Sequence, residues 1–191
     1  MSKPALANRT KNRPFALFWH LLAGAFASLS LPPLFLLPAI FAISIPLLAY
    51  LKAQSRMQAS MVFGMAGTGW FLASTYWVSH SLIVETPLLW GLAPFMALAL
   101  SLILALFWVS AAMISWPFGR RPVARLFWFV AFFSLGEWAR GFVATGFPWN
   151  LTGSLFAVDL ASLQAASVIG AYGLCVIALL FALVPAFWVL G

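Results

Sequence analysis

The 191-residue sequence is 64% hydrophobic and 17% aromatic, and only 7% of its residues are charged. A soluble domain carries about 25% charged residues, so this chain has too little polar surface to cover a water-soluble globule. It is also too apolar to be disordered, and the composition predicts an all-α, polytopic membrane protein. The net charge of +7 does not indicate a nucleic-acid partner, because the basic residues are sorted along the chain rather than clustered on one face.

Six apolar stretches follow a basic tail at 1–14. We expect transmembrane helices at about 15–31, 34–51, 61–78, 92–114, 123–139 and 165–187. The fourth is the clearest, because an uncharged helix of this length, at about 1.5 Å per residue, crosses a hydrocarbon core of about 30 Å. A cleavable signal peptide ending near Ala23-Gly24-Ala25 is the alternative for the first stretch. Everything downstream is apolar too, so a first membrane helix is the more economical interpretation.

Prolines and tryptophans mark the expected connections. Pro32-Pro33 lacks N–H donors and ends the first helix, so the first two helices are expected to form a hairpin. The stretch 80–89 is expected to be a loop. Trp77 and Trp90 flank it, and tryptophan prefers the headgroup level of a membrane.

Small residues predict close helix packing in two places. Gly64 and Gly67 in the third stretch would let a neighbouring helix approach closely, and Gly170 and Gly173 form a second patch in the sixth. The mixed segment 151–164 is expected to lie along the membrane interface.

The distribution of charge predicts the orientation. With the N-terminus in the cytoplasm, nine of the ten basic residues fall on the cytoplasmic side, as the positive-inside rule requires. These are Lys3, Arg9, Lys11, Arg13, Lys52, Arg56, Arg120, Arg121 and Arg125. Glu85, Glu137 and Asp159 fall on the other side, together with the single exception, Arg140.

That exception belongs to a dense motif at the end of the fifth stretch. Glu137 and Arg140 are three residues apart and share a helical face. Beside a bilayer, two such charges are costly unless they are paired or wetted. Either they form a structural pair that caps the helix, worth about 0–1 kcal/mol if it is exposed, or they form part of a functional site. The turn 146–149 is either a rigid entry to the interfacial segment or the border of a lateral opening.

Three other side chains are also site candidates. His20 lies inside the first helix, where helix-to-helix hydrogen bonding and function are both open. His80 is interpreted as an interfacial polar residue rather than a proton carrier. Cys175, the single cysteine, is interpreted as a buried hydrophobe rather than a reactive thiol, and no internal disulfide is possible. The sequence has no metal-ligand spacing, and no metal or cofactor is predicted.

The motif resembles that of a known family. Glu137-Trp138-Ala139-Arg140-Gly141 followed by Thr145-Gly146-Phe147-Pro148-Trp149 is similar to the E-x-x-R-G and T-G-F-P-W motifs in the membrane part of apolipoprotein N-acyltransferase. The resemblance implies a bacterial inner-membrane enzyme that moves an acyl chain from a phospholipid donor to the N-terminal amine of a diacylated lipoprotein. It also implies a thioester on a cysteine, and a Glu, Lys and Cys set in a periplasmic nitrilase-like domain that follows a seventh helix.

The sequence departs from that pattern, and no catalytic residue carries over. It extends only through the sixth predicted helix, so the nitrilase-like domain is expected to be missing and the chain alone to be inactive. Cys175 lies within a span and cannot be the family nucleophile, and the three lysines are on the wrong side. The candidate entrance for lipid or substrate comprises Glu137, Arg140, Gly146, Phe147, Pro148 and Trp149.

Two other interpretations stay open. The chain could be a stand-alone membrane protein that binds or conducts lipid or a small solute. It could also be a non-catalytic subunit whose nitrilase-like half is encoded separately. The scarcity of polar residues within the spans argues against an aqueous path.

Overall fold

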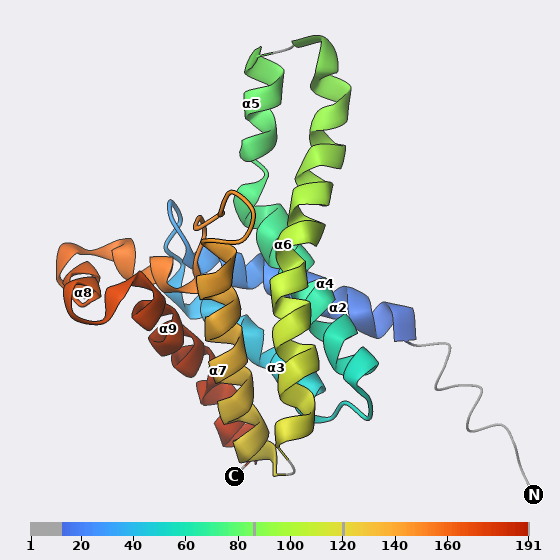
Figure 1. The fold of residues 1–191 in the computed structure, drawn as a ribbon, viewed down its shortest axis with the longest axis vertical. Coiled ribbons are helices and arrows are strands. Elements are labelled where there is room, and N and C mark those ends of the chain that lie inside the picture. Colours follow the sequence, from blue (N-terminus) through green and yellow to red (C-terminus); the bar gives the residue numbers. More distant parts are fainter. Residues whose placement is uncertain (1–12, 86, 120, 191) are drawn as a thin grey trace, which may run out of the picture.

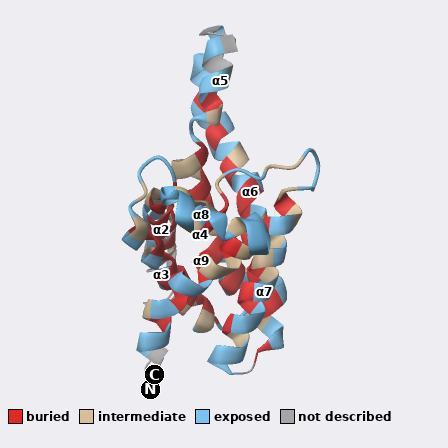
Figure 2. Cartoon of the chain, turned by 90° about the vertical axis from the view of Figure 1, so that its left-hand side faces the viewer, coloured by how far each residue is buried: buried red, intermediate tan, exposed pale blue. Residues whose placement is uncertain are grey.

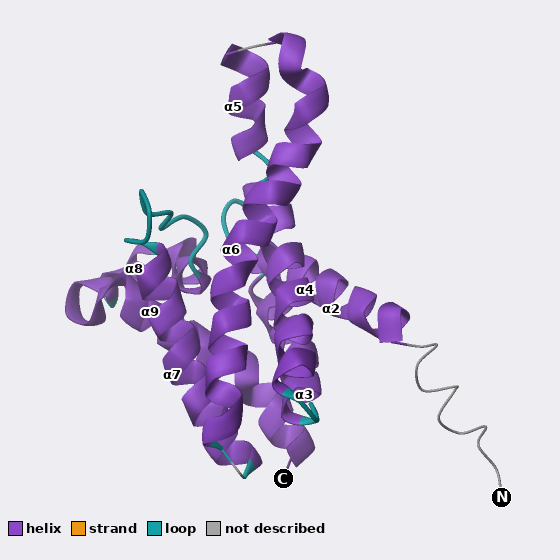
Figure 3. Ribbon diagram, turned by 45° about the vertical axis from the view of Figure 1, so that its right-hand side comes forward, coloured by secondary structure: helices purple, strands orange, loops and turns teal. Residues whose placement is uncertain are grey.

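The computed structural model describes residues 13–85, 87–119 and 121–190, in which helices and connections occur but no strand (Figure 3). The all-α prediction is confirmed for these residues, whereas the basic tail at 1–14 lies almost entirely outside them. In chain order the elements are α2 (Arg13–Ala27), η1 (Ser28–Ser30), η2 (Leu37–Ile43), α3 (Ser44–Leu51), α4 (Arg56–Thr75), α5 (Val78–Glu85), η3 (Pro87–Leu92), α6 (Ala93–Ser115), η4 (Trp116–Phe118), α7 (Pro122–Arg140), η5 (Thr152–Val158), α8 (Leu160–Gln164) and α9 (Ala166–Leu190).

Helix α4 lies at the centre of the bundle, with α2 packed on one side and α6 on the other. Helix α7 packs against α6, and α9 in turn contacts α7 and α3. Helices α6 and α7 run along the long axis of the molecule, whereas α2 crosses it obliquely (Figure 1).

Glycines make these contacts close, as predicted for Gly64 and Gly67. A Cβ atom added to either residue would lie 3.1 Å from a side-chain atom of α6. On the other side of α4, Gly69 lies directly against the backbone carbonyl of Leu21 in α2. Gly24 of α2 makes the reciprocal contact with the α4 backbone. Helix α4 therefore meets both neighbours through glycines.

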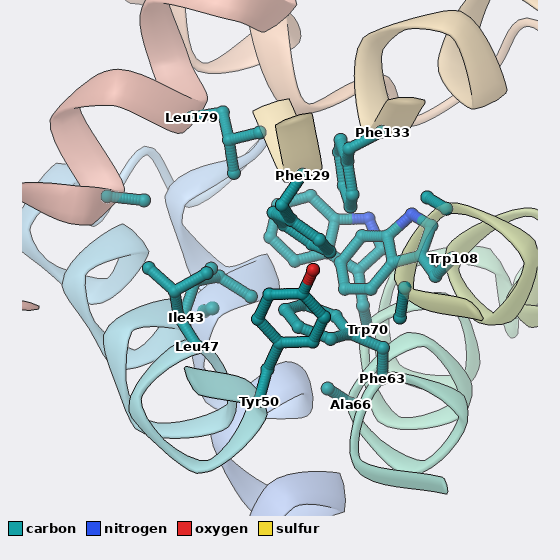
Figure 4. Close-up of a cluster of buried hydrophobic side chains, with 14 of the residues drawn as sticks. Ile43, Leu47, Tyr50, Phe63, Ala66, Trp70, Trp108, Phe129, Phe133 and Leu179 are labelled. Atoms are coloured by element: carbon teal, nitrogen blue, oxygen red, sulfur yellow. The ribbon is translucent and has the colours of Figure 1, made fainter. Parts of the chain in front are cut away.

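Aromatic rings fill the space where α3, α4, α6 and α7 meet (Figure 4). The ring centroids of Phe63 and Phe129 are 4.4 Å apart, and those of Trp108 and Phe133 are 4.9 Å apart. The Tyr50 hydroxyl shares a 2.7 Å hydrogen bond with Ser115 Oγ, so this buried polar group has a partner. The core thus joins helices that are distant in sequence.

The loop expected at 80–89 is wrong, because α5 and η3 are helical there. They form a hairpin with the beginning of α6 that protrudes from the bundle (Figures 1 and 2). The residues of α5 include no glycine or proline, and Pro87 is the first residue of η3, where a missing N–H costs no hydrogen bond. Large apolar side chains are exposed on the hairpin, with Val84 77% and Leu88 89% exposed.

Two helical stretches are long and apolar enough to cross a membrane, Trp90–Phe118 and Ala166–Val189. The apolar helices at Leu17–Ser30 and Leu37–Leu51 are shorter. Helical elements occupy most of each of the six predicted spans, but that all six cross a membrane remains a prediction. Helix α9 is kinked at Gly170, whose φ of 72° lies in the left-handed region that favours glycine.

The expected cytoplasmic connections lie together at one end of the bundle. Arg125 Nη1, at the start of α7, donates a 3.2 Å hydrogen bond to the carbonyl oxygen of Leu51, at the end of α3. The α5–α6 hairpin and the connection at 141–151 lie toward the other end (Figure 1). The orientation of these two ends in a membrane stays a prediction.

The segment expected at the interface consists of η5 and α8, and Asp159 between them caps α8. Element η5 packs against α9, and Asp159 precedes α8. The Asp159 carboxylate accepts hydrogen bonds from the Ser162 N–H at 2.9 Å and from the Ser162 hydroxyl at 2.7 Å. These bonds favour the charged form and hold the pKa of Asp159 below its ordinary value.

Candidate functional site

Glu137 and Arg140 form a buried ion pair in the last turn of α7. Arg140 Nη2 lies 3.2 Å from each carboxylate oxygen of Glu137, and each residue is only 1% exposed. The pairing predicted from their spacing is found. The surroundings are not those of an exposed surface pair, and burial makes the partners interdependent because either charge alone would be costly.

The chain after α7 folds back over Arg140 and buries it. The Phe147 N–H donates to the Arg140 carbonyl oxygen at 2.8 Å, which closes the turn. Arg140 Nη1 then donates to the carbonyl oxygens of Phe147 at 2.8 Å and Trp149 at 2.7 Å. Gly146 has a φ of 76°, a conformation that glycine adopts without strain. The guanidinium therefore holds the Gly-Phe-Pro-Trp turn through its backbone.

Glu137 is tied to two other elements. Its Oε2 accepts from the Thr152 N–H at 3.2 Å, and its Oε1 accepts from Trp108 Nε1 of α6 at 3.4 Å. Sequence reasoning missed both partners, because a backbone amide and a core tryptophan carry no local signal. The pair therefore joins α6, α7 and the start of η5.

Arg140 also contacts an aromatic ring, and one of its nitrogen atoms has no hydrogen-bond partner. Its guanidinium lies 5.0 Å from the ring centroid of Phe71, a cation–π contact. Arg140 Nε and the nearby Thr152 Oγ1 are buried without a hydrogen-bond partner. Buried polar atoms without a partner are exceptions in a folded protein.

An apolar cavity of about 460 Å³ lies between α6 and the connection after α7. Among the described residues, Arg140 is the one charged residue that lines it. Of the six candidate residues, Arg140, Gly146 and Phe147 line this cavity, and Glu137 lies behind Arg140. Its other walls are Leu100, Ile103, Leu104, Leu106, Phe107, Ser110, Val143, Ala144 and Thr145.

Trp149 lies on the outer side of the turn and does not line the cavity. It is 59% exposed, and its ring packs edge-on against Trp77 with centroids 6.2 Å apart. Pro148 is also exposed and away from the cavity. The structure thus divides the predicted entrance into a cavity-lining part and an outward aromatic edge.

Asn150 fastens the far end of the turn to α4. Its side-chain amide donates to the Ser74 carbonyl oxygen at 2.6 Å, and its own carbonyl oxygen accepts from Trp70 Nε1 at 3.4 Å. Its φ is 54°, in the left-handed region where asparagine is tolerated better than most residues.

Asn150→Ala is expected to lower the free energy of unfolding by about 1–3 kcal/mol, because it removes a partly buried hydrogen bond and keeps the positive φ. Asn150→Gly removes the same side chain, but glycine adopts the positive φ without strain. Its loss of unfolding free energy should therefore be smaller than that of Asn150→Ala. Unfolding titrations in micelles would measure both variants. An alanine variant as stable as the wild type would contradict the anchoring role.

Cys175 is a structural residue of α9. It is 1% exposed, and its sulfur accepts a long 3.4 Å hydrogen bond from the Gly153 N–H. The interpretation as a buried hydrophobe agrees with this position. The described residues include no group of three or more His, Cys, Asp or Glu side chains that could hold a metal ion. Cys175 is not among the residues that line the cavity beside Arg140.

Comparison with known proteins places this arrangement in a family. The family described as the apolipoprotein N-acyltransferase N-terminal domain matches residues 23–184. The apolipoprotein N-acyltransferase of Caulobacter vibrioides is 36% identical over 171 residues, which cover 88% of this chain and 32% of the relative. That of Rhizobium etli is 38% identical over 180 residues, which cover 86% of this chain and 33% of the relative.

A third relative, the enzyme of the same name from Rickettsia bellii, is 35% identical over 154 residues, which cover 81% of this chain and 31% of the relative. The chain thus spans about a third of the length of the curated relatives it matches. The matched region contains the whole Glu137–Trp149 site. The chain therefore belongs to the apolipoprotein N-acyltransferase family and matches its N-terminal domain.

Proposed function

We propose that this chain is the membrane part of an apolipoprotein N-acyltransferase of the bacterial inner membrane, and that it receives the phospholipid acyl donor. In the complete enzyme, an acyl chain would pass from phospholipid to the N-terminal diacylglyceryl-cysteine of a lipoprotein. The observation that carries this proposal is the apolar cavity beside Arg140. An acyl chain needs an apolar wall, and a lipid headgroup needs polar partners at one end.

The buried ion pair would keep this cavity open. Arg140 grips two carbonyl oxygens of the turn, and Glu137 holds Arg140 in place. The position of Phe147 at the cavity wall therefore depends on a charge pair beneath it. In this proposal Glu137 and Arg140 are positioning residues and take no part in bond making.

Chemistry would require residues that the described part of the chain does not offer. A thioester needs an accessible thiolate, and Cys175 is buried against Gly153. We infer that the 191-residue chain alone binds donor lipid without transferring its acyl group. A nitrilase-like half, whether fused or encoded separately, would supply the nucleophile.

A phospholipid with a diazirine near the end of one acyl chain tests the proposal in nanodiscs. Photolysis should label residues 100–110 and 143–147 in preference to the exposed surface around Val168, and labelling should saturate at a low fraction of probe. Ser110→Trp, which fills the cavity from α6, should lower this labelling several-fold. Val168→Trp, at an 86% exposed position outside the cavity, should leave it unchanged.

The same preparation, incubated with phospholipid and a diacylated lipopeptide, should yield no N-acylated product. Labelling spread evenly over the lipid-facing surface would contradict the donor site. Product formed at an enzymatic rate would contradict the proposal that a nitrilase-like half must supply the nucleophile.

A further inference from the structure

A second cavity, of about 550 Å³, lies at the opposite end of the bundle from the Glu137–Arg140 pair. It is bounded by α2, the end of α3 and the beginning of α4. One wall is apolar and includes Leu17, Met57, Met61 and Val62. Unlike the first cavity, it also has a strongly polar margin.

The beginning of α4 supplies part of that margin. Ser55 caps the helix by accepting a hydrogen bond from the Gln58 N–H at 3.2 Å, and the Gln58 side chain accepts from the Gln54 N–H at 3.0 Å. Arg56 and Met57 are the first two residues of α4, where backbone N–H groups have no intrahelical partner. Free amides at the start of a 20-residue helix favour an anion.

Two side chains extend the same margin into the cavity. Lys52 is exposed beside it, and none of the described residues that line it is acidic. His20, from α2, also lines the cavity, is only 9% exposed, and has an Nδ1 atom with no hydrogen-bond partner. The predicted interhelical hydrogen bond is thus not found at this atom. His20 therefore contributes a polar ring to the lining of the cavity, with the hydrogen-bonding capacity of its buried Nδ1 atom unused.

We propose that this cavity binds an anionic phospholipid, with its phosphate at Lys52 and the start of α4 and one acyl chain along Met57 and Met61. An amphiphile matches a site with one apolar wall and one cationic margin. The N-terminal tail carries charges of the same sign as Lys52, so it offers no complement. In the predicted orientation the ligand belongs to the cytoplasmic leaflet, which makes it distinct from the acyl donor proposed above.

Native mass spectrometry of the purified chain tests this assignment with phosphatidylglycerol and phosphatidylcholine of identical acyl chains. The protein should retain phosphatidylglycerol preferentially. Lys52→Gln should weaken its binding by about tenfold, the value of one charged hydrogen bond. Met61→Trp, which blocks the apolar wall and keeps the charge, should also weaken binding. Arg121→Gln, an exposed cation outside this cavity, is the matched control and should bind as the wild type does.

Circular dichroism establishes that each variant is folded. Equal retention of both lipids, or unchanged binding by a folded Lys52→Gln protein, would overturn the proposal. Displacement of the lipid by sn-glycerol 3-phosphate at comparable concentration would show a soluble phosphate site and overturn the lipid assignment. Diazirine labelling at the Arg140 cavity should be the same in Lys52→Gln and wild type, so failure here and failure of the proposed function are distinguishable.

Discussion

Arg140→Ala is expected to lower the free energy of unfolding by about 3–5 kcal/mol, because it leaves the Glu137 carboxylate buried without a counter-charge. The loss should exceed that of an ordinary core truncation at the same depth, since two carbonyl oxygens of the turn also lose their donor. Denaturant titration of the purified protein in mixed micelles measures the change.

Two comparisons make this prediction specific. Arg121→Ala removes an exposed arginine at the other end of α7 and should change stability by no more than about 0.5 kcal/mol. The double variant Glu137→Ala/Arg140→Ala should cost less than the sum of the two single variants, because removing both charges leaves neither unpaired. A loss below about 1 kcal/mol in Arg140→Ala would mean that water reaches the pair.

Gly69→Val is expected to lower the free energy of unfolding by an amount similar to that of Arg140→Ala. Here the cause is a steric clash rather than an unpaired charge. A Cβ at this position would overlap the Leu21 carbonyl group, and backbone cannot rotate away as a side chain can. Helices α2 and α4 would have to separate, at a cost of about 3 kcal/mol or more. The variant should show a broadened or missing unfolding transition and an aggregated fraction in size-exclusion chromatography.

Gly91→Val is the matched control, because nothing lies within 4 Å of a Cβ at that position. It should elute and unfold as the wild type does. If Gly69→Val behaved in the same way, the close contact between α2 and α4 would be wrong.

The sequence predicted the pairing of Glu137 and Arg140 but not their burial. Spacing along a helix decides which side chains meet within one turn. Burial depends on the connection folding back, which rests on hydrogen bonds to backbone atoms of Phe147, Trp149 and Thr152. Backbone acceptors are present at every position, so composition cannot indicate which of them Arg140 will use.

The predicted packing roles of the glycines are confirmed at some positions and not at others. Gly64 and Gly67 do permit a close helix contact, as their spacing indicated. Gly170 was grouped with Gly173 as a packing patch, yet nothing lies within 4 Å of a Cβ placed on it. Its φ of 72° shows a conformational role instead. Sequence alone does not distinguish a glycine needed for space from one needed for its backbone angle.

The described residues of the stretch 80–89 are helical although a loop is expected there, because Pro87 begins a helix rather than marking a connection. His80 and Glu85 are compatible with a short helix when no glycine intervenes, and α5 includes both. Propensity is a weak guide over eight residues, and packing against α6 decides the outcome.

Labelling from the two sides of the membrane tests the central claim most directly, namely that the Glu137–Arg140 end and the Lys52 end face opposite compartments. Single cysteines at Arg56 and Ala161, both exposed positions, would be placed in a Cys175→Ala background. An impermeant maleimide applied to spheroplasts should react with the cysteine at 161 at once, and with the one at 56 only after the membrane is permeabilised. Immediate reaction at 56 with protection at 161 would contradict the account.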